Sequence, residues 1–148
     1  MPVGGSQPHP PAGRASSLSR VDGAFLHTCY RVLDLDRSIA FYTDCLGMEL
    51  RRTMPIRDEA TNAFLSFPGD EESRLELTLN HGRTEPYNIG TGYGHIALGV
   101  ADLDATLAAL AAKGVEPEKA PYRVREGGSR LCFVRDPDGY RIELIERG

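Results

Sequence analysis

Features that would place this 148-residue chain in several other protein classes are missing from its sequence. No apolar run approaches the roughly 20 residues that a membrane-spanning helix needs, so a membrane protein is not expected. Lys and Arg are scattered and the net charge is -4, which argues against a nucleic-acid partner. The N-terminus lacks the basic-then-apolar order of a secretory signal, so a cytoplasmic location is expected.

Cysteine is also scarce, and its spacing excludes two further classes. Cys29, Cys45 and Cys132 form no CxxC pair and leave one residue over. This pattern fits neither a disulfide scaffold nor a zinc ribbon, and buried free thiols are the simpler interpretation. Cys29 differs from the other two because strand alternation puts it on the same face as His27.

The composition that remains is that of a globular protein, with 41% apolar and 26% charged residues. The length suits one ordinary domain, or two half-size modules that share a core. Residues 1–22 are rich in Pro, Gly and Ser and show no apolar period, so we expect a disordered tail there. Residues 23–148 are expected to form a single domain.

The domain contains an internal repeat. HTCYRVLDLDRS from His27 aligns with HIALGVADLDAT from His95, at an offset of 95 − 27 = 68. In both copies an alternating segment leads into DLD, and a helical pattern follows that stops at Gly47 or Gly114. The candidate N-caps of these helices are Asp34, Asp36, Asp102 and Asp104.

The ends of the two copies also match. RLELT and RIELI place Glu76 and Glu143 in correspondence, at an offset of 143 − 76 = 67. Further alternating stretches at 49–53, 63–67 and 131–134 supply the remaining strands, and the turn DPDG at 136–139 joins the last two strands as a hairpin. The sequence therefore predicts an α+β fold of two βαβββ modules, at about 24–82 and about 91–147, that form a curved mixed sheet with a cleft.

Strand alternation indicates where the unusual polar residues point. In the stretch from Arg74, Leu75 and Leu77 lie on one face and Glu76 lies on the other. The other three stretches alternate in the same sense, so each polar residue is predicted to face away from the core. The four residues in this position are His27, Glu76, His95 and Glu143.

Two histidines and two glutamates at repeat-equivalent positions form a donor set for a metal ion. The hypothesis is that the two modules direct all four side chains to one shared point. Imidazole and carboxylate together suit Ni, Zn, Co, Mn or Fe, with open positions left for water or substrate. A single His or Glu on a strand needs no such role, but four at matched positions favour the metal site. His81 has no repeat partner and is interpreted as a loop residue.

Segments spread over residues 25–147 resemble one known family. They read LHTCYRV, DLDRSIAFYTDCLGMEL, LELTLN, GTGYGHIAL and FVRDPDGYRIELIE, and are similar to the glyoxalase I (lactoylglutathione lyase) family of the vicinal oxygen chelate superfamily. In that family the metal ligands are His, Glu, His and Glu at the four candidate positions. Related epimerases usually carry Gln at the second position, and extradiol dioxygenases and fosfomycin-resistance transferases use two His and one Glu. Glu76 therefore favours glyoxalase I.

The resemblance implies a carbon–sulfur lyase that detoxifies methylglyoxal by isomerising its hemithioacetal with glutathione to S-lactoylglutathione. It implies that Glu143 is the general base and that Glu76 is a second catalytic carboxylate, which serves the other diastereomer. Short enzymes of the family are commonly homodimers whose sites lie at the interface, and they tend to be activated by nickel or cobalt. We therefore expect a homodimer and prefer Ni²⁺, with Zn²⁺ or Co²⁺ as alternatives.

The resemblance carries over the glutathione contacts only in part. Arg31 and Asn80 match the family positions that hold the glutamyl end of the tripeptide. The segment VREGGSRLC is one residue shorter than its family counterpart, so Arg125 and Arg130 both compete for a further basic position. This departure leaves the identity of the thiol open.

Two alternative functions remain at this point. One is a metal-free module that sequesters a ligand, as the bleomycin-binding proteins of the superfamily do, although those proteins lack the full ligand set. The other is a related lyase or epimerase that uses another thiol or a CoA ester. Metal analysis separates the first alternative, and replacement of the cosubstrate separates the second.

Overall fold

The two halves of the chain form two separate sheets in the computed structural model, which describes residues 21–148. The elements are β1 (Thr28–Val32), α1 (Leu35–Ala40), η2 (Phe41–Cys45), β2 (Glu49–Ile56), β3 (Ala60–Ser66), β4 (Leu75–Asn80), β5 (Ile96–Val100), α2 (Leu103–Ala112), β6 (Leu131–Arg135) and β7 (Arg141–Glu146). The strand orders are β1-β4-β3-β2 and β5-β7-β6. The predicted tail, residues 1–22, lies outside the described residues except for its last two.

The two sheets repeat one arrangement of strands. β1 runs parallel to β4, and β3 lies antiparallel to β4 on its other side. β5, β7 and β6 are arranged in the same way, which confirms the predicted α+β architecture. The second sheet differs in one respect, because the strand expected beside β6 is reduced to a single bridge between Tyr122 and Leu131.

The helices begin and end at residues that the sequence singles out. Asp34 and Asp102 are the N-caps, and each accepts a hydrogen bond from the backbone N–H three residues ahead. Gly47 and Gly114 follow the helices with φ of 83° and 78°, a region that glycine adopts without strain. Among the residues that the structure describes, no helix is long and apolar enough to cross a bilayer.

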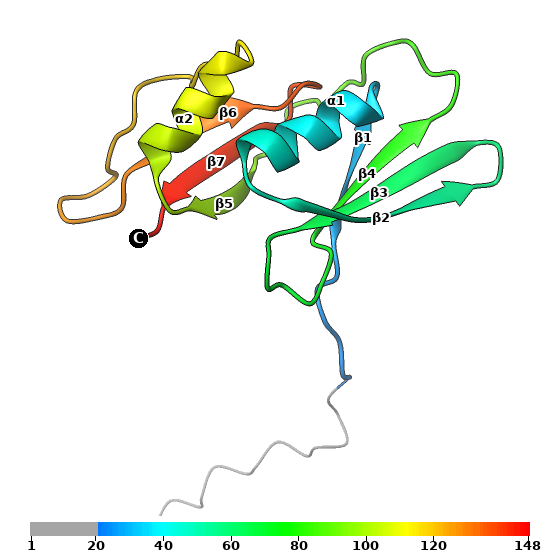
Figure 1. Ribbon diagram of the computed structural model, residues 1–148, viewed down its shortest axis with the longest axis horizontal. Helices are drawn as coiled ribbons and strands as arrows, with labels where there is room; N and C mark the ends of the chain where they lie inside the picture. Colours follow the sequence, from blue (N-terminus) through cyan, green and yellow to red (C-terminus); the bar gives the residue numbers. More distant parts are fainter. Residues whose placement is uncertain (1–20) are drawn as a thin grey trace, which may run out of the picture.

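The apolar faces of both sheets pack with the helices into one core. Leu75 and Leu77 of β4 are buried, as are Ile142 and Leu144 of β7. Burying each such side chain contributes about 2 kcal/mol, which fixes these faces inward and leaves the alternate residues on the outer faces. Figure 1 shows the four-stranded sheet on one side of α1 and the three-stranded sheet, covered by α2, on the other.

The DPDG turn between β6 and β7 joins the two halves of the chain. Oδ2 of Asp136 accepts a hydrogen bond of 2.6 Å from the Tyr42 hydroxyl. Asp138 accepts a second bond from the backbone N–H of Leu33, at 3.0 Å, and a third from the Ser38 hydroxyl, at 3.3 Å. The turn predicted from sequence as a hairpin connection therefore also attaches the second sheet to α1 and η2.

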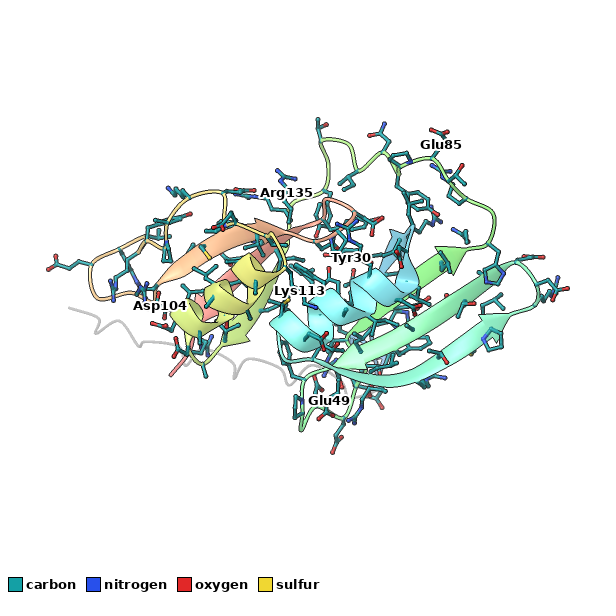
Figure 2. The ribbon with its side chains drawn as sticks, turned by 45° about the horizontal axis from the view of Figure 1, so that its top comes forward. Tyr30, Glu49, Glu85, Asp104, Lys113 and Arg135 are labelled. Atoms are coloured by element: carbon teal, nitrogen blue, oxygen red, sulfur yellow. The ribbon has the colours of Figure 1, made fainter. Side chains whose placement is uncertain are left out.

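Three tyrosines occupy the same junction. The rings of Tyr30 and Tyr140 stack with their centroids 4.2 Å apart, and Tyr93 meets both rings edge-on at 5.8 Å. The Tyr30 and Tyr93 hydroxyls are hydrogen-bonded to each other. Figure 2 shows Tyr30 near the middle of the molecule. Burial, followed by the hydrogen bond with Tyr93, raises the pKa of Tyr30 well above its ordinary value.

Candidate metal centre

The first His–Glu pair lies on the outer face of the four-stranded sheet. His27 directly precedes β1, and Glu76 is the second residue of β4. Nε2 of His27 lies 2.6 Å from Oε2 of Glu76. The side chains are 36% and 14% exposed, so both donors are reachable from solvent.

The second pair repeats this placement on the other sheet. His95 directly precedes β5, and Nε2 of His95 lies 3.7 Å from Oε1 of Glu143 in β7. In both sheets the glutamate is paired in register with the residue two places after the histidine: Cys29 with Glu76, and Ala97 with Glu143. The sequence repeat therefore corresponds to one backbone geometry used twice.

A phenylalanine supports each histidine ring, which was not predicted from the sequence. The ring centroids of His27 and Phe64 are 5.8 Å apart, and those of His95 and Phe133 are 5.0 Å apart, both edge-on. Phe64 is the cross-strand partner of Glu76, as Phe133 is of Glu143. Extending the repeat alignment to this strand, at 133 − 64 = 69, would have found both residues.

An arginine covers each phenylalanine in turn. The guanidinium of Arg52 lies 4.2 Å from the Phe64 centroid, and that of Arg141 lies 3.7 Å from the Phe133 centroid. Arg141 is fixed by two hydrogen bonds of 2.8 Å to Glu118, which lower the pKa of that carboxyl. Each histidine ring thus packs against a phenylalanine that an arginine covers, and this packing restricts the orientation of the ring.

A hollow of about 390 Å³ adjoins the first pair. His27 and Glu76 line it together with Arg52, Asn62 and Phe64. Its walls carry charged, amide and aromatic groups, which is the mixture that a small polar ligand needs for both affinity and orientation.

The two pairs do not meet within one chain. Among residues 21–148, no three His, Cys, Asp or Glu side chains are gathered closely enough to hold one ion. The sites expected between two subunits stay a prediction, and within one chain the two pairs lie apart over these residues. The reason is that the sheets share no strand pairing and are joined through the helices and the DPDG turn, with one pair on each sheet.

Arg31 and Asn80 share the face of the first pair. Arg31 is two residues beyond Cys29 in β1 and is exposed, and Asn80 ends β4 on the Glu76 side of the strand. Nδ2 of Asn80 donates a hydrogen bond of 3.0 Å to the Tyr87 hydroxyl. Both predicted glutathione contacts therefore lie along one exposed strip of sheet that leads to His27 and Glu76.

Arg125 and Arg130 differ in their surroundings. Arg130 donates two hydrogen bonds to the Asp104 carboxylate, at 2.9 and 3.2 Å, and lies 3.7 Å from Glu146. Figure 2 labels Asp104 on α2, the helix that this arginine ties down. Arg125 lines a small hollow with Ser129 in the loop before β6. These contacts give Arg130 a structural role and favour Arg125 as the anion contact.

The donor chemistry of both pairs fits a divalent transition metal. Each pair offers an imidazole nitrogen and a carboxylate oxygen side by side on a partly exposed face, and two such pairs make a four-donor set that leaves coordination positions open. The one exposed thiol, Cys29, faces Thr78 at 3.3 Å.

A sequence model of the Glyoxalase/Bleomycin resistance protein/Dioxygenase superfamily matches residues 24–144, which include all four candidate ligands. The chain belongs to this superfamily. Within the glyoxalase superfamily it is 48% identical to a lactoylglutathione lyase of Haemophilus influenzae over 123 residues, covering 82% of this chain and 90% of that protein.

Plant glyoxalases are similar but longer. The chain is 49% identical over 127 residues to the lactoylglutathione lyase GLX1 of Arabidopsis thaliana, covering 84% of this chain and 44% of that protein. The crystal structure of glyoxalase I from Zea mays superimposes with a TM-score of 0.75 at 44% identity, covering 84% of this chain and 44% of that chain. The chain thus spans less than half the length of these plant relatives.

Proposed function

We propose that the chain is a glyoxalase I, a metal-dependent lyase that converts the methylglyoxal–glutathione hemithioacetal to S-lactoylglutathione. The observation that carries the proposal is the pair of His–Glu sites at equivalent register positions on the outer faces of the two sheets. The relatives named lactoylglutathione lyase, including one of nearly the same length, support it. Cytoplasm remains the predicted compartment.

The complete site is proposed to form between two copies of the chain. His27 and Glu76 of one copy would meet His95 and Glu143 of the other, so a homodimer would carry two equivalent sites. Three features support this arrangement. The pairs do not meet within residues 21–148 of one chain, β1 and β5 each have a strand neighbour on one side only, and Phe25, two residues before His27, is 68% exposed.

The four ligands would hold one divalent ion, and Ni²⁺ is our preference over Zn²⁺ or Co²⁺. A bound ion supplies Lewis-acid stabilisation of the negative charge that develops on two adjacent substrate oxygens. Glu143 acts as the base: it takes the proton from C1 of the hemithioacetal and delivers it to C2, while the hydroxyl proton moves from the C1 oxygen to the C2 oxygen. Glu76 does the same for the other diastereomer.

The remaining contacts hold the thiol. Arg31 and Asn80 lie on the exposed strip beside the first pair and are proposed to bind the glutamyl end of glutathione. Arg125 is proposed to meet a carboxylate of the tripeptide, because Arg130 is engaged by Asp104 and Glu146. Orienting the thiol in this way presents the reacting carbons to the carboxylates.

The proposal is tested with protein stripped by a chelator and re-loaded separately with Ni²⁺ and Zn²⁺. Formation of S-lactoylglutathione from methylglyoxal and glutathione is followed for each sample. Turnover restored by Ni²⁺ supports the reaction and the metal preference, whereas restoration by Zn²⁺ alone supports the reaction and overturns the preference. Metal binding without turnover would point to another thiol or to an epimerase, and no metal binding would point to a ligand-sequestering module.

A further inference from the structure

The two glutamates occupy the same backbone position but have different neighbours. In each sheet, the strand pairing identifies three residues around the carboxylate. They are the partner of the glutamate on the parallel strand, the residue two places after the glutamate, and the antiparallel partner of that second residue. The equivalent positions, first module and then second, are Cys29 and Ala97, Thr78 and Ile145, and Asn62 and Leu131.

The neighbours of Glu76 are all polar, and Cys29 and Asn62 both contact Thr78. The Thr78 hydroxyl lies 3.2 Å from Oε1 of Glu76 and 2.9 Å from Oδ1 of Asn62. The Cys29 thiol lies 3.3 Å from the same hydroxyl. Thr78 is therefore at the centre of a small network, and Asn62 is buried beneath it.

The hydroxyl of Thr78 carries one hydrogen, so it can donate to only one of the two oxygens at a time. The Asn62 amide has the same shape after a half turn, and its NH₂ group then donates to the hydroxyl. In that arrangement the hydroxyl donates to Glu76, which is the stronger acceptor because it is a carboxylate. The hydrogen-bond chain then runs from Asn62 through Thr78 to Glu76.

The residues at the three equivalent positions around Glu143 form no such hydrogen-bond network. Ala97, Ile145 and Leu131 have no side-chain donor, and within residues 21–148 the Glu143 carboxylate makes no hydrogen bond. Its contact with His95 is 3.7 Å long, against 2.6 Å for the pair in the first sheet. Among the described residues, the Glu76 carboxylate thus has a hydrogen-bond donor and a short contact with its histidine, and the Glu143 carboxylate has neither.

We propose that Thr78 is a positioning residue that holds Glu76 more firmly as a metal ligand than Glu143 is held. The second module has Ile145 at the equivalent position, which leaves Glu143 the freer of the two carboxylates to accept the proton. The inference rests on the proposed function, because it concerns the same four ligands. It gives a physical reason why two glutamates at equivalent positions would differ in metal binding and in proton transfer.

The test compares Thr with Val at both positions, because these side chains have nearly the same shape. Thr78→Val removes the hydroxyl, and a hydrogen bond to a metal ligand is worth about 10- to 100-fold in metal affinity. We expect the Kd for Ni²⁺, measured by competition with a chromophoric chelator, to rise at least about tenfold in this variant. Thr78→Ser keeps the hydroxyl and should restore the wild-type Kd.

The second position is tested by adding a hydroxyl beside Glu143. Ile145→Thr should tie this carboxylate down, so kcat should fall while the Kd for Ni²⁺ stays the same or tightens. Ile145→Val removes the same methyl group without adding a hydroxyl, and should keep the wild-type kcat. A fall of equal size in both variants would overturn the assignment of a free Glu143.

The outcomes separate this inference from the proposed function. If the wild-type protein binds Ni²⁺ and turns over, and Thr78→Val has the same Kd as wild type, the positioning role is wrong while the function stands. If the wild-type protein itself binds no metal, the proposed function fails first. Far-ultraviolet circular dichroism of each variant checks that the fold is intact.

Discussion

Glu143 is the residue on which the proposed proton transfer depends most directly. Glu143→Gln keeps the size and one carbonyl oxygen of the side chain but cannot accept a proton. Because a positioned base contributes on the order of 10² to 10⁴ in rate, kcat should fall by that factor while the metal content, measured by mass spectrometry, is largely retained. Glu76→Gln is the matched control and should lower kcat less. If the two effects are reversed, Glu76 is the base.

Asp136 is a carboxyl whose ionisation opposes folding. It is 5% exposed, and burial raises its pKa from 3.8 to about 6 even though the Tyr42 hydroxyl and two backbone N–H groups donate to it. The folded state therefore binds more protons than the unfolded state between about pH 4 and pH 6. The stability that the protonated Asp136 carboxyl contributes is fully present below this pH window and is lost as the pH rises through it. The free energy of unfolding falls by about 3 kcal/mol as a result.

Asp136→Asn tests this sign. The amide oxygen still accepts from the backbone of the turn, and the side chain no longer ionises. Urea denaturation should show that the variant gains stability relative to wild type as the pH is raised from 4 to 7. Asp36→Asn, at an exposed position in α1, is the control and should show no such trend. A constant difference between the Asp136 variant and wild type at both pH values would contradict the raised pKa.

At the scale of elements, the helices depend on their N-caps. Asp34→Ala and Asp102→Ala should each lower the free energy of unfolding by about 1 kcal/mol, since each removes one bond to an otherwise unpaired backbone N–H. The two losses should add in the double variant, because the caps are on different helices. Asp36→Ala, two residues after the Asp34 cap, should lower the free energy of unfolding by only a few tenths of a kcal/mol. Equal losses in all three single variants would rule out a specific capping effect.

The starts and ends of the helices could be predicted because they depend on local chemistry. Of four candidate aspartates, the structure uses Asp34 and Asp102, and both predicted stop glycines adopt positive φ. The π-helical turn η2 could not be predicted. It buries Phe41, Tyr42 and Cys45 together, and that demand comes from the opposing sheet and α2 rather than from neighbours in the chain.

Which residues face the core and which face outward could be predicted as well, because strand alternation is also a local property of the chain. The apolar residues of β4 and β7 are buried and the glutamates face outward, as period two requires. The βαβββ pattern predicted one strand more in the second sheet than the structure forms, since the pairing of Tyr122 with Leu131 is an isolated bridge.

At the scale of the whole molecule, the proposed interface sites make a complementation experiment decisive. A variant lacking His27 and Glu76 and a variant lacking His95 and Glu143 should each be inactive alone. Mixed under conditions that allow subunit exchange, they should regain activity, because each heterodimer contains one site with all four ligands and one with none. Silence of the mixture, with heterodimers demonstrated by mass spectrometry, would show that the ligands do not combine across an interface.

The four candidate ligands could be chosen from sequence because the repeat supplies each residue twice. The placement of one pair on each module was predicted as well, but the position of one module relative to the other could not be, because it depends on long-range contacts such as those of Asp136 and Asp138 with α1 and η2. The Thr78 network is equally hidden, since Asn62 and Thr78 are neighbours only through strand pairing.

The stacked tyrosines at the module junction have a spectroscopic consequence. The chain has no tryptophan and six tyrosines, so tyrosine dominates its near-ultraviolet signals, and half of those rings belong to the Tyr30, Tyr93 and Tyr140 cluster. The cluster draws one ring from the first module and two from the second, in a rigid chiral arrangement. If one module separated from the other to pair with a second chain, the optical activity of these rings would change while the backbone signal stayed constant. The tyrosine cluster is therefore an intrinsic spectroscopic probe of the junction between the two modules.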